Sequence, residues 1–112
     1  MAYERELLKG NTDFMLLVLL GEQPRYGYQL SKEVKARSMG YFSFKEGTLY
    51  PALHRLEHAG LVTARWEASP SGQQRRYYHI TVKGLKAVKN RMRSWRSFAS
   101  ALDLVLQPIT AS

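Results

Sequence analysis

Seven polar or cationic residues in the middle of the sequence have the chemistry of a phosphate-binding surface. Five of them precede or lie within the segment Glu46 to Val62, EGTLYPALHRLEHAGLV, and two form a later arginine pair. Hydroxyl groups, cationic side chains and the free backbone N–H groups at a helix start all donate hydrogen bonds to phosphate oxygens. We therefore predict nucleic-acid contacts from Ser43, Lys45, Thr48, Tyr50, His54, Arg75 and Arg76.

Other chemistry has little support in the sequence. His54 and His58 are one helical turn apart with Glu57 between them, a spacing that suits a divalent metal ion, but no third ligand is evident. Exposed histidines are the favoured interpretation, and we predict no metal and no other cofactor. There is no cysteine, only two aspartates, and neither a glycine-rich phosphate loop nor a serine elbow. We predict that the protein is not an enzyme.

The composition favours a polyanionic partner. The chain has 112 residues, of which 45% are hydrophobic, and a formal net charge of +8 with a pI near 10.0. For a small basic domain the commonest polyanion is nucleic acid, although charge alone also fits a merely soluble basic protein.

The strongest apolar run, Phe14 to Leu20, follows Arg5 and Lys9 and superficially copies a signal peptide. It is too short to span a bilayer, and no small-residue cleavage site follows it. We expect a buried helix in a cytoplasmic protein that does not contact membranes.

Two helices are expected in the first 40 residues. Asn11 to Asp13 offers N-cap side chains, and Gly21 with Pro24 marks the end of a first helix of about ten residues. Because this helix is apolar nearly all round, it must be covered on more than one side, which suggests a second subunit. A second, amphipathic helix is predicted from about Arg25 to Ser38, closed by Gly40.

The third helix has to accommodate Pro51. Ser43 and Glu46 match a capping box, but a helix that starts with Thr48 as N-cap places Pro51 in the first turn, where its missing donor costs nothing. We prefer Thr48, with residues 43–47 as an irregular lead-in. Leu49, Leu53 and Leu56 then face the core.

Two strands follow, from Leu61 to Ala68 and from Gln74 to Thr81, joined by a turn. Side-chain alternation predicts that only one of Arg75 and Arg76 faces DNA. The alternative interpretation is that one of them is an ordinary cross-strand partner of Glu67. Three helices and a two-stranded ribbon are the order of a winged helix-turn-helix, in which the third helix enters the major groove. The predicted fold class is α+β.

A long helix is predicted after Lys83, ending before Pro108. Its apolar residues repeat at alternating spacings of three and four, as in a coiled coil: Leu85, Val88, Met92, Trp95, Ala99, Leu102 and Leu106. We predict a DNA-binding domain at residues 1–81 and a dimerisation helix with its tail at residues 82–112. The parallel stripe of Lys86, Lys89, Arg93 and Arg96 is interpreted as a solvated flank rather than a phosphate contact.

Trp95 and the adjacent Phe98 allow two interpretations. Core packing of Trp95 is favoured, and the alternative is stacking on a flat apolar ligand between the two copies of a dimer.

The stretches LLKGNTDFMLLVLL, YGYQLSKEV, EGTLYPALHRLEHAGLV and SGQQRRYYHITVKG together resemble the PadR family of bacterial transcriptional regulators. The resemblance implies a winged-helix repressor of the short branch, a homodimer whose single C-terminal helix packs against the first helix of the partner. It also implies a palindromic operator in double-stranded DNA and release by a small aromatic effector, for which Trp95 and Phe98 are candidate contacts.

By the same resemblance, Lys45, Thr48 and Tyr50 match the family's contact region, and Arg75 and Arg76 match its wing arginines. Gln73 and Gln74 stand where many relatives carry further arginines, so weaker wing contacts are expected. Two rivals stay open. One is a winged-helix protein-interaction module that binds an acidic protein partner, and the other is a small-molecule-binding dimer without an operator.

Overall fold

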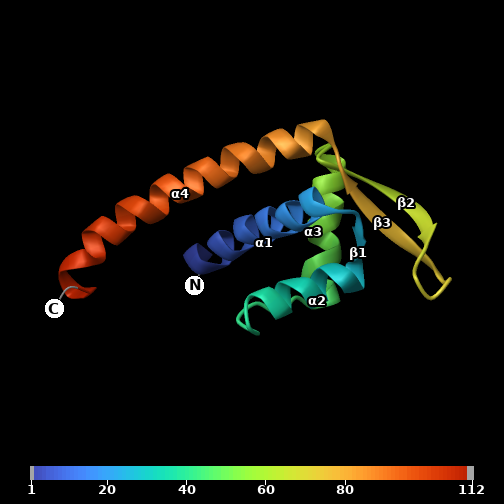
Figure 1. Ribbon diagram of the computed structural model, residues 1–112, viewed down its shortest axis with the longest axis horizontal. Helices are drawn as coiled ribbons and strands as arrows, with labels where there is room; N and C mark the ends of the chain where they lie inside the picture. The colour runs from blue at the N-terminus through green and yellow to red at the C-terminus, as the bar shows by residue number, and fades with distance from the viewer. Residues whose placement is uncertain (1, 111–112) are drawn as a thin grey trace.

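The computed structural model describes the backbone of residues 2–110 and the side chains of residues 10–107. Its elements are α1 (Ala2–Glu22), β1 (Arg25–Tyr26), α2 (Gly27–Arg37), α3 (Glu46–His58), β2 (Val62–Ala68), β3 (Gln74–Ile80) and α4 (Val82–Thr110). In Figure 1 the first three helices gather beside the base of the β2–β3 hairpin, which projects away from them, and α4 runs back above α1 and beyond its start. The predicted α+β winged helix-turn-helix with a long C-terminal helix is confirmed.

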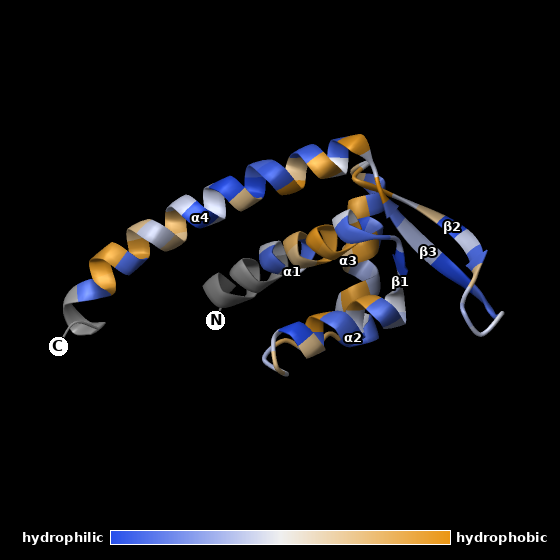
Figure 2. Ribbon diagram, in the orientation of Figure 1, coloured by the Kyte–Doolittle hydropathy of each residue, from blue (hydrophilic) through white to orange (hydrophobic). Residues whose placement is uncertain are grey.

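The core lies where the three helices meet the base of the sheet. Its fully buried side chains come from every layer and include Leu16, Leu30, Leu53, Val62 and Tyr78. Figure 2 shows the apolar segments of α1 and α3 concentrated where these two helices meet. Burial of this apolar surface is the main stabilising contribution to the fold.

Helix α1 begins at Ala2, so the predicted start at Asn11 to Asp13 is wrong. These polar residues lie inside the helix because tertiary contacts use their side chains. Thr12 is only 4% exposed, and the Asp13 carboxylate accepts hydrogen bonds of 2.8 Å and 3.3 Å from Arg55 of α3. A residue type that favours caps therefore serves here to dock two helices.

The predicted start of α3 is also wrong. The helix begins at Glu46, and Lys45 is its N-cap in an extended conformation, without a side-chain cap from Ser43 or Thr48. The Lys45 carbonyl accepts bonds of 2.9 Å from the N–H groups of Thr48 and Leu49. Pro51 thus lies in the second turn. Because proline has no N–H group, the carbonyl of Gly47 loses its helical hydrogen bond, but Gly47 is exposed to water.

The ribbon has a third strand that the sequence did not indicate. Arg25 belongs to β1 rather than to the second helix, and β1 pairs antiparallel with β3, giving the order β1-β3-β2. The Tyr26 ring meets Tyr77 of β3 edge to face, with ring centroids 5.3 Å apart. A two-residue strand has no periodicity to detect. Strands β2 and β3 lie within one residue of their predicted bounds.

Helix α4 starts against α1 and continues past the predicted end. Val88 is buried in the common core. The helix runs to Thr110 instead of ending before Pro108. The φ angle of proline is compatible with a helix, and the one hydrogen bond that its missing N–H removes is that to the carbonyl of Leu104, an exposed residue.

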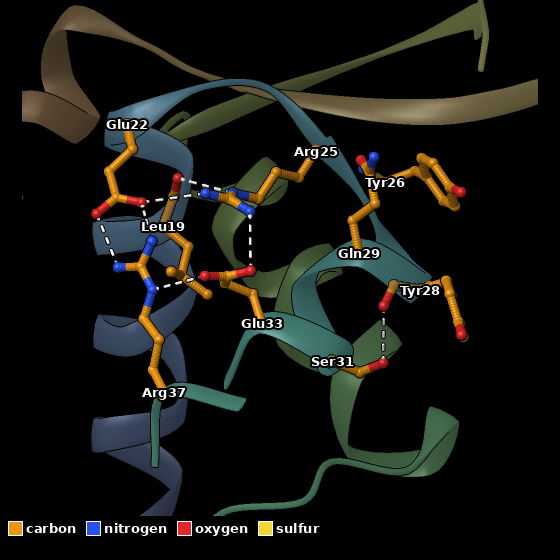
Figure 3. Close-up of polar contacts among 9 residues, drawn as sticks. All are labelled: Leu19, Glu22, Arg25, Tyr26, Tyr28, Gln29, Ser31, Glu33 and Arg37. Carbon is orange, nitrogen blue, oxygen red and sulfur yellow. Dashed lines mark hydrogen bonds and ion pairs between the residues drawn. The ribbon is translucent and has the colours of Figure 1, made fainter. Parts of the chain in front are cut away.

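An ion-pair network fixes α2 on the end of α1 (Figure 3). The buried Arg25 side chain donates to the Leu19 carbonyl and lies 3.1 Å from Glu22 and 3.7 Å from Glu33. Arg37 closes the network with bonds of 2.6 Å and 2.8 Å to Glu22 and of 2.8 Å to Glu33. Two arginines and two glutamates therefore join α1, β1 and α2 into one unit.

This network predicts a pH-dependent contribution to stability. The hydrogen bond from Arg37 lowers the pKa of the Glu22 carboxyl in the folded state. The carboxylate thus stabilises the fold above its unfolded pKa, and that stability is lost as pH falls through the folded pKa. We expect Glu22→Gln to cost at most about 1 kcal/mol at neutral pH, since the pair is accessible to solvent, and close to nothing in acid.

Urea unfolding of both chains at neutral and acidic pH measures this difference. Asp103→Asn is the matched control, because Asp103 is exposed and takes part in no ion pair among the described side chains. An equal cost of Glu22→Gln at both pH values would contradict the prediction.

Candidate nucleic-acid interface

Helix α3 presents an exposed face opposite its buried leucines. The residues on this face are Gly47, Pro51, His54 and His58. His54 was predicted as a contact residue, whereas Gly47 and Pro51 were missed. The assumed helix start at Thr48 excluded Gly47, and a helical wheel drawn from Glu46 would have shown both residues on this face.

Thr48 and Tyr50 lie on opposite flanks of the exposed face. They are about 200° apart around the axis, at about 100° per residue. Thr48 joins the predicted Ser43 at a hollow beside Arg55 and the loop before α3. Tyr50 faces α2 and the wing instead. The exposed Lys45 stands at the N-cap, close to the free N–H groups of the first turn.

The Tyr50 side chain is seated on the start of α2. A Cβ atom built on Gly27 would come within 2.6 Å of the Tyr50 hydroxyl oxygen, so this approach requires glycine. The tyrosine is still 39% exposed. It therefore links the two helices of the helix-turn-helix and keeps part of its ring and hydroxyl at the surface.

The two wing arginines have different surroundings. Arg76 is exposed and lies 3.3 Å from Glu57 of α3, while Arg75 is half-buried, with its guanidinium carbon 5.4 Å from the centre of the Tyr26 ring. Residues 74–76 pair with β2 only, so the other edge of β3 is open there. Both arginines reach the same hollow at this edge, although strand alternation points them to opposite faces.

One wing arginine is the cross-strand partner of Glu67, as the alternative interpretation expects, but its side chain bonds another residue. Arg75 stands directly opposite Glu67 in register. Glu67, however, bonds His79 at 2.8 Å and lies 3.8 Å from Arg65, while Arg75 bonds the side chain of Gln73 at 2.8 Å. The ring stacking on Tyr26 draws Arg75 away from the acid, so its charge is not neutralised by a carboxylate within the described side chains.

Comparison with known proteins identifies this architecture. Residues 16–90 match the model of the transcriptional regulator PadR-like family. The chain belongs to the PadR-like family. It is 31% identical over 102 residues to an uncharacterised protein of Lysinibacillus sphaericus, covering 91% of this chain and 94% of that protein.

Solved structures agree with the PadR-like assignment. A PadR-like transcriptional regulator from Bacillus cereus superposes with a TM-score of 0.82 at 31% identity, over 91% of this chain and 97% of that one. A transcriptional regulator from Clostridium thermocellum gives a TM-score of 0.77 at 31% identity, over 88% and 92% of the two chains. The protein is thus a PadR-like transcriptional regulator, and this family is not a class of enzymes.

The aromatic pair of this PadR-like chain lies on α4, away from the wing. Trp95 is 49% exposed, and its ring centroid is 5.8 Å from that of Phe98, which is also exposed. The favoured core packing of Trp95 is therefore not achieved within one chain. The coiled-coil seam is buried at Val88, half-buried at Met92 and open to solvent further along the helix.

Neither a metal centre nor a membrane span accompanies these features in the part of the chain that the structure describes. Glu57, which stands between the two histidines of α3, pairs with Arg76, and no group of three or more possible ligands comes together among the described residues. Within the same range, no helix is long and apolar enough to cross a bilayer.

Proposed function

We propose that two copies of this PadR-like regulator bind a palindromic operator in double-stranded DNA and repress transcription, and that a small aromatic effector releases them. One observation carries the DNA-binding part. The exposed face of α3 stands beside a wing whose two arginines reach the same hollow at the open edge of β3, so one surface offers a helix for the major groove and cations for the flanking phosphates.

The contact residues follow from this arrangement. His54 and the exposed backbone at Gly47 are nearest to the base edges. Ser43, Lys45 and Thr48 contact phosphates on one flank of α3, and Tyr50, Arg75 and Arg76 contact them on the other flank. Because phosphate contacts fix the register without reading sequence, most of these side chains supply affinity and orientation rather than specificity.

The homodimer is supported by apolar surface that one chain leaves in water. Beyond Met92 the seam of α4 is exposed at Trp95, Leu102 and Leu106, and Met15 and Val18 of α1 are only partly buried. In a dimer in which the seam of α4 of each copy packs against α1 of the other copy, both apolar surfaces would be buried. Residues 1–81 then form the DNA-binding domain and residues 82–112 the dimerisation element, of which residues 111–112 lie outside the described range.

The effector would bind beside the same helices. Trp95 and Phe98 of each copy are exposed aromatic rings on the seam side of α4, and paired rings of this kind stack on flat apolar molecules. A ligand that changes the angle between the two α4 helices also changes the spacing of the two α3 helices, which determines the fit to successive major grooves.

Fluorescence anisotropy over a salt series tests this proposal. A duplex from upstream of the protein's own gene is compared with a scrambled duplex of equal length. Much tighter binding of the native duplex at physiological salt, falling steeply as salt rises, is expected. Equal and weak binding of both duplexes would favour the rival, a winged-helix module for an acidic protein partner.

The double variant Arg75→Ala, Arg76→Ala is expected to bind every duplex more weakly. Each lost phosphate contact lowers the slope of log affinity against log salt by about 1, with little change in the preference between duplexes. The matched control is Arg93→Ala, Arg96→Ala, which removes two exposed arginines from α4. The proposed role of the wing is wrong if both double variants keep the wild-type slope.

A further inference from the structure

A hollow of about 300 Å³ separates the start of α2 from α3 and the wing. Four aromatic residues line it, Tyr26 of β1, Tyr28 of α2, Tyr50 of α3 and Trp66 of β2, together with Arg75 and Arg76 of β3. None of the described residues that line it is acidic. The hollow therefore combines hydroxyl and guanidinium donors with flat apolar surface, and its net charge is positive.

Trp66 is the least expected member of this group. It is 66% exposed, although it stands on the same face of β2 as the buried Val62, the face that meets the helices. Its direct neighbour across the strands is Arg76. A large indole exposed to water on the helix-facing side of the sheet, next to a cation, offers a stacking surface that the fold itself does not use.

The α2 side of the hollow is held in place. Figure 3 shows Tyr28 pointing away from the ion-pair network that fixes α2 on α1. The Tyr28 ring is 63% exposed. The side chain of Gln29 accepts the N–H of Tyr26 at 3.1 Å, so the turn that carries Tyr28 is fixed at both ends. A backbone fixed in this way loses little conformational freedom when the residues that it carries bind a ligand.

Arg75 supplies an unsatisfied donor at the same place. Its Nη2 atom bonds Gln73, but its Nε atom is buried without a hydrogen-bond partner among the described residues. Leaving a buried donor unpaired is destabilising. A small rotation of Arg75 that turns this donor towards an acceptor in the hollow is therefore favourable.

We propose that this hollow holds one backbone phosphate of the bound duplex and the deoxyribose next to it. Tyr28, Tyr50 and the two arginines donate to the phosphate oxygens, and the sugar packs on the Trp66 ring. The inference rests on the proposed DNA binding and adds Tyr28 and Trp66 as positioning residues. The backbone is favoured over a free anion because the hollow lies between α3 and the wing, where a strand flanking the major groove passes.

Trp66 fluorescence reports on the hollow directly. The chain has two tryptophans, so a Trp95→Phe background leaves Trp66 as the single reporter. Since phosphate contacts do not depend on sequence, a mixed-sequence duplex at low salt serves as the probe besides the native upstream duplex. We expect the Trp66 emission to change at the duplex concentration at which anisotropy shows binding.

The affinity test uses Trp66→Ala and Tyr28→Phe in the wild-type background. Each is expected to weaken the binding of both duplexes about tenfold. Tyr28→Phe loses a charge-assisted hydrogen bond to phosphate, and Trp66→Ala loses the apolar surface on which the sugar packs. Leu104→Ala is the control, because Leu104 is exposed on α4, away from both hollows beside α3, and it is expected to bind like the wild type.

A phosphate scan identifies the contact. Neutral methylphosphonate replaces one backbone phosphate at a time, and at one position per half-site the penalty should be smaller with Tyr28→Phe than with the wild type, because one of the donors to that phosphate is already missing. Circular dichroism and thermal unfolding of each variant confirm that it is folded.

Three results would overturn the inference. If duplexes bind while the Trp66 emission and the affinities of both variants stay unchanged, the hollow has no part in DNA binding, and the proposed function stands. If Trp66 responds to benzoate but not to any duplex, the hollow is a site for small aromatic anions. If no duplex binds at low salt, the inference and the proposed function are both wrong.

Discussion

Leu102→Asp is expected to sediment as a monomer at micromolar concentrations at which the wild-type chain sediments as a dimer. Leu102 lies on the seam of α4, four residues before Leu106 and seven after Trp95. A carboxylate at this position in both copies would place two like charges in an apolar interface, where desolvation costs several kcal/mol. Because a palindrome is bound through two half-sites, affinity for the operator should fall roughly a hundredfold or more.

Leu104→Asp is the control for this prediction. It is the same substitution two residues along α4, at a side chain that is 70% exposed and off the seam, whereas Leu102 is 43% exposed. We expect Leu104→Asp to stay dimeric and to bind the operator like the wild type. Sedimentation velocity together with anisotropy measures both properties. A wild-type chain that is itself monomeric at micromolar concentration would refute the proposed homodimer.

Gly84→Ala is expected to destabilise the fold by about 2 kcal/mol or more, the upper range for overpacking against backbone. A Cβ atom at position 84 would collide with the backbone carbonyl oxygen of Leu61 and come within 2.6 Å of the Ile80 side chain. The Thr81 hydroxyl bonds the Leu61 carbonyl and accepts the N–H of Gly84 at 3.0 Å, so this corner cannot open without breaking those bonds.

Gly47→Ala is the matched control, since it makes the same change inside α3 at a glycine with open space around its Cβ position. Alanine is the better helix former by up to about 1 kcal/mol, so this variant should unfold at a higher temperature than the wild type. Thermal unfolding followed by circular dichroism compares the three chains. If Gly84→Ala gains stability as Gly47→Ala does, the close packing of α4 on the base of the wing is wrong.

The loss of folding stability in Gly84→Ala and the loss of the dimer in Leu102→Asp have different physical origins. The loss from Gly84→Ala occurs within one chain, where α4 leaves the wing, and it should not depend on protein concentration. The loss from Leu102→Asp occurs between chains, and it should grow as the protein is diluted. The first turns of α4 pack on the common core through Val88, so this part of the proposed dimerisation element also contributes to the stability of the single chain.

The amino-acid sequence by itself determined the fold class, the β2–β3 hairpin, the amphipathic α3 and the long α4. Each of these has a repeated signal. The leucines of α3 recur at spacings of three and four, the seam of α4 extends over about three heptads, and two runs rich in β-formers flank a turn of Ser69 to Gly72. These elements can be predicted from the sequence because each helical turn, or each second residue of a strand, places an apolar side chain on the same buried face.

Only the tertiary structure decided where α1 and α3 begin, that Arg25 and Tyr26 form a third strand, and which polar side chains meet. Asp13 has the chemistry of a cap and instead binds Arg55, 42 residues away, so a local rule misplaced the helix start. Gly27, Tyr50 and Trp66 come from three different elements and converge on one hollow. Such contacts depend on how the elements pack in space, and no spacing along the chain records that geometry.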